Sequence, residues 1–322
     1  MLEVIADLIL KFAKRISIDE TEAFLQKKNL KLVQISKGLI KKVSEIEKSG
    51  VAVRSIIDKK IGFVATNSSS NIENTVELSA QNARNSIQNI TQSFVDKKSI
   101  TRVEGIRDNQ LRDLELEDMS IRILEIVKSL EESKPLKKID GSVLIETEER
   151  LIVNSSGLWK REVNTKMQAQ IETVIEIDEY LVIGSGLLHT HNLTNNWQDL
   201  FNTAIKTAYS QQGRTKLAID KPKAVVFSPK AMGQIIAYSL IPSFYITNEG
   251  HYLQSITKYK FSPDIEMIDD PTFPNAQNTF GFDDEGYPTK PRVIYNNGQC
   301  KQLLGMNFTC AEYDPRIIYL GN

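Results

Sequence analysis

The sequence predicts an α+β fold in which antiparallel sheets are flanked by helices. Two long regions, residues 20–66 and 141–188, consist of alternating or β-branched segments separated by turn residues. Amphipathic segments of helical period precede, separate and follow these regions, and such grouping of strands and helices is typical of the α+β class. With 41% hydrophobic and 25% charged residues, the composition is that of an ordinary globular protein.

The chain begins with an amphipathic helix over residues 1–15. Its apolar residues recur at spacings of three and four, at Leu2, Ile5, Ile9 and Phe12. Residues 20–66 then predict an antiparallel meander of a few strands. Turns are expected where turn-forming residues occur, at 28–29, 37–38, 49–50 and 58–59.

Two further helices are expected before the second β region. Ser70 and Glu73 form a capping box that predicts the start of the first, which continues as a core-facing helix. The second covers residues 115–132 and stops before Pro135. Between them, the charged stretch 96–113 shows no clear period, so we expect a surface loop.

The second β region predicts one hairpin around residues 148–150, a turn at 154–157 and another strand pair up to residue 188. Gly184, Ser185 and Gly186 are interpreted as a kink at a strand end. A helix is expected over 196–210. The polar stretch 211–223 then predicts a boundary between an N-terminal and central α+β domain, residues 1–212, and a C-terminal β-rich domain, residues 213–322.

The C-terminal domain should open with a short buried strand, residues 224–227. A helix follows, with Ser228 as its cap and Pro229 at its first position, and runs to about residue 240. The remaining sequence is rich in Pro, Asn and Gly, which favours short strands and ordered loops.

Charge and cysteine content exclude several classes of protein. The 40 basic and 41 acidic residues give a net charge of −1, which argues against a dedicated nucleic-acid binder. Two cysteines exclude a disulfide framework and indicate a reducing compartment, so we expect a cytoplasmic protein. No segment has the pattern of a signal peptide or membrane span, and we expect no membrane partner.

Histidine content limits metal chemistry. The three histidines are His189, His191 and His251, and no two are four or five residues apart, so the chain cannot form a helical zinc site of the H-E-x-x-H kind. His189 and His191 would share one face of a strand and could reach one metal. A third ligand would have to come from His251, Cys300, Cys310 or a carboxylate. Two exposed histidines near a strand end are the alternative interpretation.

Two acidic clusters could supply oxygen ligands for Ca²⁺ or Mg²⁺. They are Asp269 with Asp270, and Asp283, Asp284 and Glu285 followed by Gly286. Their spacing does not match an EF-hand loop, and turn-forming side-chain bonds explain them equally well. The sequence also lacks a Gly-x-Ser-x-Gly elbow and a phosphate-binding loop.

Five segments together resemble the TldD/PmbA family, known as modulators of DNA gyrase and grouped with zinc metalloproteases. In order, they are GVAVRSIIDKKIGFVAT (50–66), VNSSGL (153–158), DDPTFPN (269–275), FDDEGYPT (282–289) and IYNNG (294–298). The resemblance implies a TldD/PmbA-like fold. It assigns no role to the acidic residues of the last motifs.

In that family, the TldD-type subunit carries H-E-x-x-x-H on a helix that follows a short apolar strand. Overlaying that strand on residues 225–227 places the two histidines and the glutamate at Ser228, Gly233 and Pro229. The chain is therefore similar to the PmbA (TldE) side of the family, which lacks the metal. The resemblance implies no catalytic residue, metal or cofactor in this chain, with zinc in a TldD-like partner of a cytosolic heteromer. It also implies proteolysis of peptides or unfolded chains.

Two alternatives remain at this point. One is a metallopeptidase with a relocated site around His189, His191 and His251. The other is a regulator that binds a topoisomerase or nucleic acid. Family members continue past the segment matched by residues 319–322, so we expect a shortened C-terminal part: a truncated chain, one split between two genes, or a degenerate paralogue.

Overall fold

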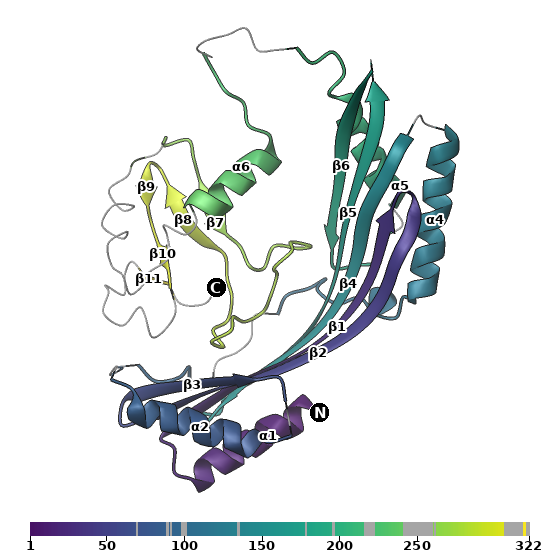
Figure 1. The fold of residues 1–322 in the computed structure, drawn as a ribbon. Coiled ribbons are helices and arrows are strands. Elements are labelled where there is room, and N and C mark those ends of the chain that lie inside the picture. Colours follow the sequence, from purple (N-terminus) through teal and green to yellow (C-terminus); the bar gives the residue numbers. More distant parts are fainter. Residues whose placement is uncertain are drawn as a thin grey trace.

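The computed structural model describes most of the chain. The described residues are 1–68, 70–87, 90, 92–97, 102–133, 136–177, 179–194, 197–215, 223–240, 260, 262–305 and 318–319. Within them the fold is α+β, with one large curled antiparallel sheet and flanking helices, as the sequence predicted (Figure 1).

The sheet has six strands in the order β3-β2-β1-β4-β5-β6, and every neighbouring pair is antiparallel. The strands are β1 (Glu20–Ser36), β2 (Leu39–Ile57), β3 (Lys60–Thr66), β4 (Leu136–Asn154), β5 (Trp159–Ile177) and β6 (Tyr180–Thr190). Four of the six are 17 to 19 residues long. The sheet curls as a whole, which gives it a convex and a concave face (Figure 1).

Helices cover the convex face in two groups. At one end lie α1 (Leu2–Arg15) and α2 (Ile72–Asn85), packed on a core that contains Leu25, Val53 and Leu151. At the other end lie α4 (Leu116–Ser133) and α5 (Trp197–Tyr209), packed on a larger core. A short helix, α3 (Asn109–Arg112), lies in the segment between α2 and α4. The amphipathic pattern of the sequence therefore predicted the four long helices correctly.

The C-terminal part lies on the concave side of the sheet (Figure 1). Its elements are α6 (Pro229–Ile235), the π-helical turn η1 (Ile236–Leu240), β7 (Met267–Asp269), β8 (Arg292–Asn296), β9 (Gln299–Cys300), β10 (Leu303–Leu304) and β11 (Ile318–Tyr319). The strands β7, β8 and β9 form a small antiparallel sheet. The proposed boundary between residues 212 and 213 stays a prediction.

Two helices approach the sheet closely over glycines. A Cβ atom at Gly62 would overlap the backbone of Ser79 and Ala83 in α2. A Cβ atom at Gly184 would overlap the backbone of Ala204 and Ala208 in α5. The prediction of a strand-end kink at 184–186 was wrong, because these residues lie inside β6 and their missing side chains let α5 pack against the strand.

Other predicted turns fall inside long strands. Lys28 lies opposite Lys48 within the β1–β2 pair, so the turns at 28–29 and 49–50 do not exist. The hairpin around 148–150 is likewise absent, because β4 runs without interruption to the correctly predicted turn after Asn154. Within the described part of the chain, this middle part of β1 and β2 is half-buried or exposed, so its side chains face solvent or the polar layer of the concave face.

Local errors concern caps and one strand. Asn71, not Ser70, caps α2, since its side chain accepts the N–H of Asn74. Ser228 does cap α6, and its Oγ accepts the N–H of Ala231 at 3.3 Å. Residues 224–227 form no strand and are exposed, with Val226 at 95%, so the expectation of a short buried strand was wrong. No helix among the described residues is long and apolar enough to cross a membrane.

Candidate functional site

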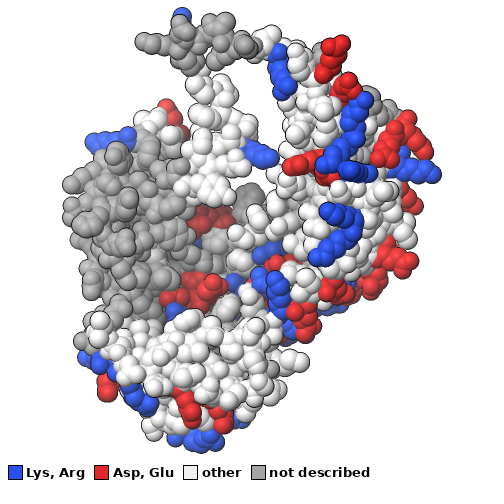
Figure 2. All heavy atoms as spheres, in the orientation of Figure 1, with Lys and Arg blue, Asp and Glu red and all other residues white. Residues whose placement is uncertain are grey.

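The centre of the concave face is a layer of charged and polar side chains. Successive side chains of a strand alternate between faces, so the residues opposite the convex core all point to this side. They are Glu22, Gln26 and Lys28 on β1, Arg54 on β2, Glu146, Glu148 and Arg150 on β4, and Lys160, Glu162, Asn164 and Lys166 on β5. Figure 2 shows acidic and basic side chains gathered in the hollow between the sheet and the C-terminal part.

Arg54 joins this layer to the C-terminal part. Its Nε donates to Oε1 of Glu22 at 2.8 Å, and its Nη2 contacts the same oxygen. Its Nη1 donates to Oε1 of Glu285 at 3.2 Å, across 231 residues of sequence. One guanidinium thus holds two buried carboxylates, and Glu285 belongs to the FDDEG segment.

This arrangement changes the acidity of two carboxyls. Burial raises the pKa of Glu22 to about 7, against the opposing effect of Arg54. Burial also raises the pKa of Asp283 to about 6, and the neighbouring carboxylate of Glu285 adds to this shift. The cluster therefore holds more acid groups than its one arginine neutralises, and the raised pKa values of Glu22 and Asp283 lie close to neutral pH.

Arg150 forms a second link between the sheet and the C-terminal part. Its Nη2 donates to the carbonyl oxygen of Phe282 at 2.7 Å, and its guanidinium lies 3.9 Å from the centroid of the Phe280 ring. Its Nη1 also reaches Oδ1 of Asp284 at 3.3 Å. Lys160, which is 2% exposed, donates to the carbonyl oxygen of Gly286 at 2.8 Å.

The acidic motif at 283–286 is built as a turn. Oδ1 of Asp283 accepts the backbone N–H groups of Glu285 at 3.0 Å and Tyr287 at 2.8 Å. Gly286 has a φ of +81°, a conformation that favours glycine. The Asp284 side chain is 81% exposed. Of the two interpretations from sequence, turn formation accounts for Asp283 and Gly286, while Glu285 makes the contact to Arg54.

Asp269 and Asp270 lie in a different place and have separate partners. Oδ1 of Asp270 accepts the N–H and the hydroxyl of Thr272, which is again a turn. Oδ2 of Asp269 lies 3.7 Å from Nη1 of Arg292, and burial raises its pKa. Within the described ranges, no three His, Cys, Asp or Glu side chains come together as a metal site would require.

The two neighbouring histidines have different surroundings. His189 is exposed near the end of β6, where partial burial lowers its pKa. His191 is 1% exposed, and its Nδ1 lies 2.9 Å from Oδ1 of Asn164 and 2.7 Å from the carbonyl oxygen of Thr165. Its Nε2 lies 2.7 Å from the carbonyl oxygen of Ala276. Both ring nitrogens are therefore occupied, and His191 fastens the loop around residue 276 to the sheet.

The other candidate ligands named from the sequence are Cys300, His251 and Cys310. Cys300 is half-buried at the end of β9, and its Sγ lies 3.5 Å from the carbonyl oxygen of Gln302. His251 and Cys310 lie outside the described residues.

An open groove adjoins the polar layer where β3 ends. Its volume is about 550 Å³, and its lining includes Phe24, Gln26, Gly50, Ala52, Ala65 and Asn67. Phe24 packs against the apolar cluster that contains Phe282, and the Gln26 amide donates to Oε1 of Glu148. The groove is therefore continuous with both the charged layer and the FDDEG segment, and its size falls within the range of ligand sites.

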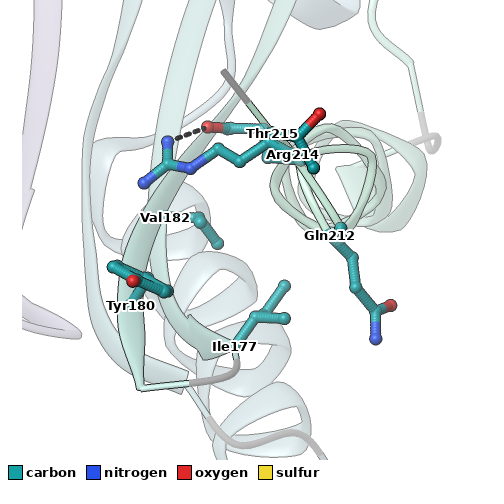
Figure 3. A pocket seen from close by; sticks show the side chains of 8 residues that line it. Ile177, Tyr180, Val182, Gln212, Arg214 and Thr215 are labelled. Carbon is teal, nitrogen blue, oxygen red and sulfur yellow. Dashed lines mark hydrogen bonds between the residues drawn. The ribbon is translucent and has the colours of Figure 1, made fainter.

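A second cavity lies at the far end of the molecule. It has a volume of about 440 Å³ and is bordered by the β5–β6 hairpin and the residues that follow α5. Figure 3 shows Arg214 and Tyr180 among its lining, with the Arg214 guanidinium 5.9 Å from the Tyr180 ring centroid. Its described lining holds no carboxylate, histidine or cysteine, and we assign it no chemistry.

Comparison with family models decides the classification. Residues 21–83 match domain 1 of the PmbA/TldA metallopeptidases, and residues 221–314 match their C-terminal domain. The chain belongs to the TldD/PmbA family. The first match contains Glu22 and Arg54, and the second contains the FDDEG segment that Arg54 contacts. The matched regions thus meet at the charged layer.

Individual relatives agree with this classification. A metalloprotease of Methanocaldococcus jannaschii is 23% identical over 305 residues, which cover 88% of this chain and 65% of that protein. A candidate modulator of a DNA gyrase from Thermotoga maritima superposes with a TM-score of 0.83 at 17% identity, covering 98% of this chain and 74% of that one. TldE from Thermococcus kodakarensis gives a TM-score of 0.78 at 19% identity, covering 96% and 71%. The chain thus spans slightly less than two thirds of the curated metalloprotease.

Sequence reasoning missed the part of this site that lies on the large sheet. Glu22, Arg54, Arg150 and Lys160 were assigned no role, because isolated charges inside a strand pattern resemble a solvated face. A signal was present: Arg54 interrupts the apolar segment GVAVRSII, residues 50–57. A charge at such a position needs a buried partner, and the acidic FDDEG segment was the obvious candidate.

Proposed function

We propose that this chain is a non-catalytic, PmbA (TldE)-type subunit of a TldD-type zinc metalloprotease of the cytoplasm. Its complex acts on peptides or unfolded polypeptides. The observation that carries the proposal is the composition of α6, the helix that the sequence resemblance aligns with the family's zinc-binding helix. The residues at the three motif positions are Ser228, Pro229 and Gly233.

The local structure of α6 does not fit zinc. Ser228 uses its Oγ to cap the helix, Pro229 forms its first turn, and Gly233 has no side chain. Zinc in proteins is held by Cys, His, Asp or Glu, and none of these occurs between residues 224 and 240. We therefore assign no hydrolytic step to this chain. The similarity to TldE from Thermococcus kodakarensis supports this assignment.

The surface around α6 supports a partner subunit. Val225, Val226 and Tyr238 are 63%, 95% and 83% exposed, and Phe227 is 48% exposed. Soluble proteins seldom expose so many large apolar residues within one short segment unless it forms an interface. The proposed occupant is a TldD-like subunit that carries the H-E-x-x-x-H helix.

The test is co-expression with a TldD-like protein that carries that motif. We expect a joint peak in size-exclusion chromatography, bound zinc and peptide cleavage in the complex, and neither zinc nor cleavage in the isolated chain. Val226→Lys with Tyr238→Lys should abolish the joint peak. The matched control is Leu124→Lys, on the exposed side of α4, which should leave it unchanged. One zinc per chain with peptidase activity in the isolated protein would end the proposal.

The two alternatives have less support. A relocated metal site needs the ring nitrogens of His191, which contact three oxygen acceptors of the protein instead. A role at DNA gyrase is stated for the Thermotoga maritima neighbour and not for this chain. The net charge of −1 provides no overall electrostatic attraction between this chain and DNA. A gel-shift assay at low salt tests the second alternative, and retardation of DNA would revive it.

A further inference from the structure

The strand β2 has an open edge that begins at the groove. The last pair between β2 and β3 joins Val51 to Thr66, after which β3 ends. β2 continues from Gly50 to Leu39, paired only with β1. Among the described residues, no strand covers the outer edge of Leu39–Gly50, so a row of backbone N–H and C=O groups faces outward.

The groove gives this edge a shape that admits another chain. Its floor consists of small residues, Gly50, Ala52 and Ala65, and Phe24 forms an apolar wall. A Cβ atom at Gly50 would meet only the carbonyl oxygen of Thr66, at 3.7 Å, so the space above this residue is open. An added strand that continued the line of β3 would run beside Gly50 at the end of this floor, since Ala52 and Ala65 are already paired with each other.

The charge of the edge defines the kind of chain that fits. Glu45 and Glu47 already have partners on β1: Asn29 donates to Glu45 at 2.7 Å, and Lys27 pairs with Glu47 at 2.9 Å. Lys41, Lys42 and Lys48 are exposed, and none forms an ion pair with any described residue. Lys42 and Lys48 share the face of Gly50 and Ala52. The edge is therefore positive beside the groove.

We propose that the outer edge of Leu39–Gly50 binds an extended, acidic stretch of substrate polypeptide as an added antiparallel strand. A small or apolar side chain of that stretch lies beside Gly50, and its carboxylates lie near Lys42 and Lys48. Backbone pairing makes the binding tolerant of sequence, while the lysines set the preference for negative charge. The inference rests on the proposed action on polypeptides, but it needs neither zinc nor a partner.

The test uses the isolated full chain and labelled decapeptides in fluorescence anisotropy. We expect saturable binding of blocked (Glu-Val)₅ and at least tenfold weaker binding of blocked (Lys-Val)₅. In a strand, alternate N–H groups point to the same neighbour. N-methylation of one alternate set of residues should therefore abolish binding, and methylation of the other set should leave it largely intact. Equal effects of the two sets, or no saturable binding of the acidic peptide, would overturn the proposal.

Variants locate the site on the chain. Gly50→Val fills the groove, and Lys42→Glu with Lys48→Glu reverses the charge of the edge. Each of these variants should bind the acidic peptide at least tenfold more weakly. Lys206→Glu is a matched charge reversal on the exposed side of α5 and should have no effect. If circular dichroism shows that Gly50→Val does not fold, the methylated peptides tested on the unaltered chain still decide whether a strand is added. Peptide binding without a joint peak would reject the proposed subunit role alone, and the reverse result would reject this inference alone.

Discussion

The guanidinium of Arg54 on β2 donates to Oε1 of Glu285 at 3.2 Å and so connects the sheet to a motif 231 residues later. The same guanidinium holds Glu22, which is 2% exposed. This contact gives the acidic turn at 283–286 a role in the fold, because it supplies a partner for a cation on the concave face of the sheet.

Arg54→Ala should destabilise the chain by about 3–5 kcal/mol, because it leaves two buried carboxylates without their cation. Urea denaturation followed by circular dichroism measures this loss. Arg161→Ala is the control: Arg161 pairs with Glu149 on the exposed surface, where a salt bridge contributes at most about 1 kcal/mol. Equal losses in the two variants would show that the buried cluster has no special role.

The stability of the chain should fall as the pH rises through neutrality. The folded-state pKa of Glu22 is about 7, above its ordinary value of 4.5, so between these values the folded chain holds a proton that the unfolded chain has released. The stability linked to this proton is fully present below about pH 4.5 and is lost as the pH passes 7. Asp283, with a pKa of about 6, acts in the same direction.

Glu22→Gln isolates that contribution, since the amide resembles the protonated acid at every pH. The free energies of unfolding of variant and wild type should be similar near pH 5, and the variant should be more stable by a few kcal/mol at pH 8. Urea titrations at five pH values give the difference. A difference that stays constant across the range contradicts the assignment.

The neighbouring acids Asp283 and Asp284 should respond very differently to truncation. Asp283→Ala removes the acceptor of two backbone N–H groups and should cost about 1–3 kcal/mol. Asp284→Ala removes an exposed side chain and should change stability by less than about 0.5 kcal/mol. Thermal denaturation of the two variants makes the comparison, and a larger loss of stability in Asp284→Ala would contradict the role assigned to Asp283 in the turn.

His191→Ala should loosen the loop around residue 276, because the contacts of the ring with the carbonyl oxygen of Ala276 and with Oδ1 of Asn164 are lost. We expect a loss of about 1–3 kcal/mol and faster amide hydrogen exchange in residues 271–281. His189→Ala, on the exposed end of β6, is the control and should do neither. An unchanged exchange pattern in His191→Ala would mean that this histidine does not fasten the loop.

Gly184→Ala should destabilise by about 1–3 kcal/mol, because the new methyl group overlaps the backbone of α5. Gly233→Ala is the matched control within α6, where a Cβ atom meets nothing within 4 Å. That change should be neutral or stabilise by up to about 1 kcal/mol, since alanine favours the helix. Chemical denaturation of the pair provides the measurement.

Much of the fold could be predicted from local pattern, and the wrongly predicted turns inside the strands share one physical cause. The four long helices follow from the spacing of residues such as Ile9, Ile123 and Phe201, because each helix buries one side on the sheet. The predicted strands ended too early, at 28–29 and 148–150, because the polar residues there resemble turn residues. The sequence alone does not show that these side chains face solvent or a polar layer. Very long strands are also uncommon, so turn residues in their middle were given too much weight.

The candidate site was predictable only in part. The acidic motifs were recognised, and their turn geometry follows from Asp283 and Gly286. Their partners Arg54 and Arg150 come from strands far away in sequence, and only the sheet register brings them together. The separation of His189 from His191 also depends on tertiary structure, because the chain leaves the strand between them and buries the second ring.

The order of strands in the sheet has a consequence for synthesis on the ribosome. β1 lies between β2 and β4, and Gln26 on β1 bonds with Glu148, 122 residues later. At about 5–20 residues per second, the nascent N-terminal hairpin waits on the order of ten seconds before β4 emerges to close its other side. During that interval the apolar side chains of Val33 and Ile35 lack the part of their core that β4 provides. We therefore expect early folding of this protein to depend on chaperones that shield apolar surface on nascent chains.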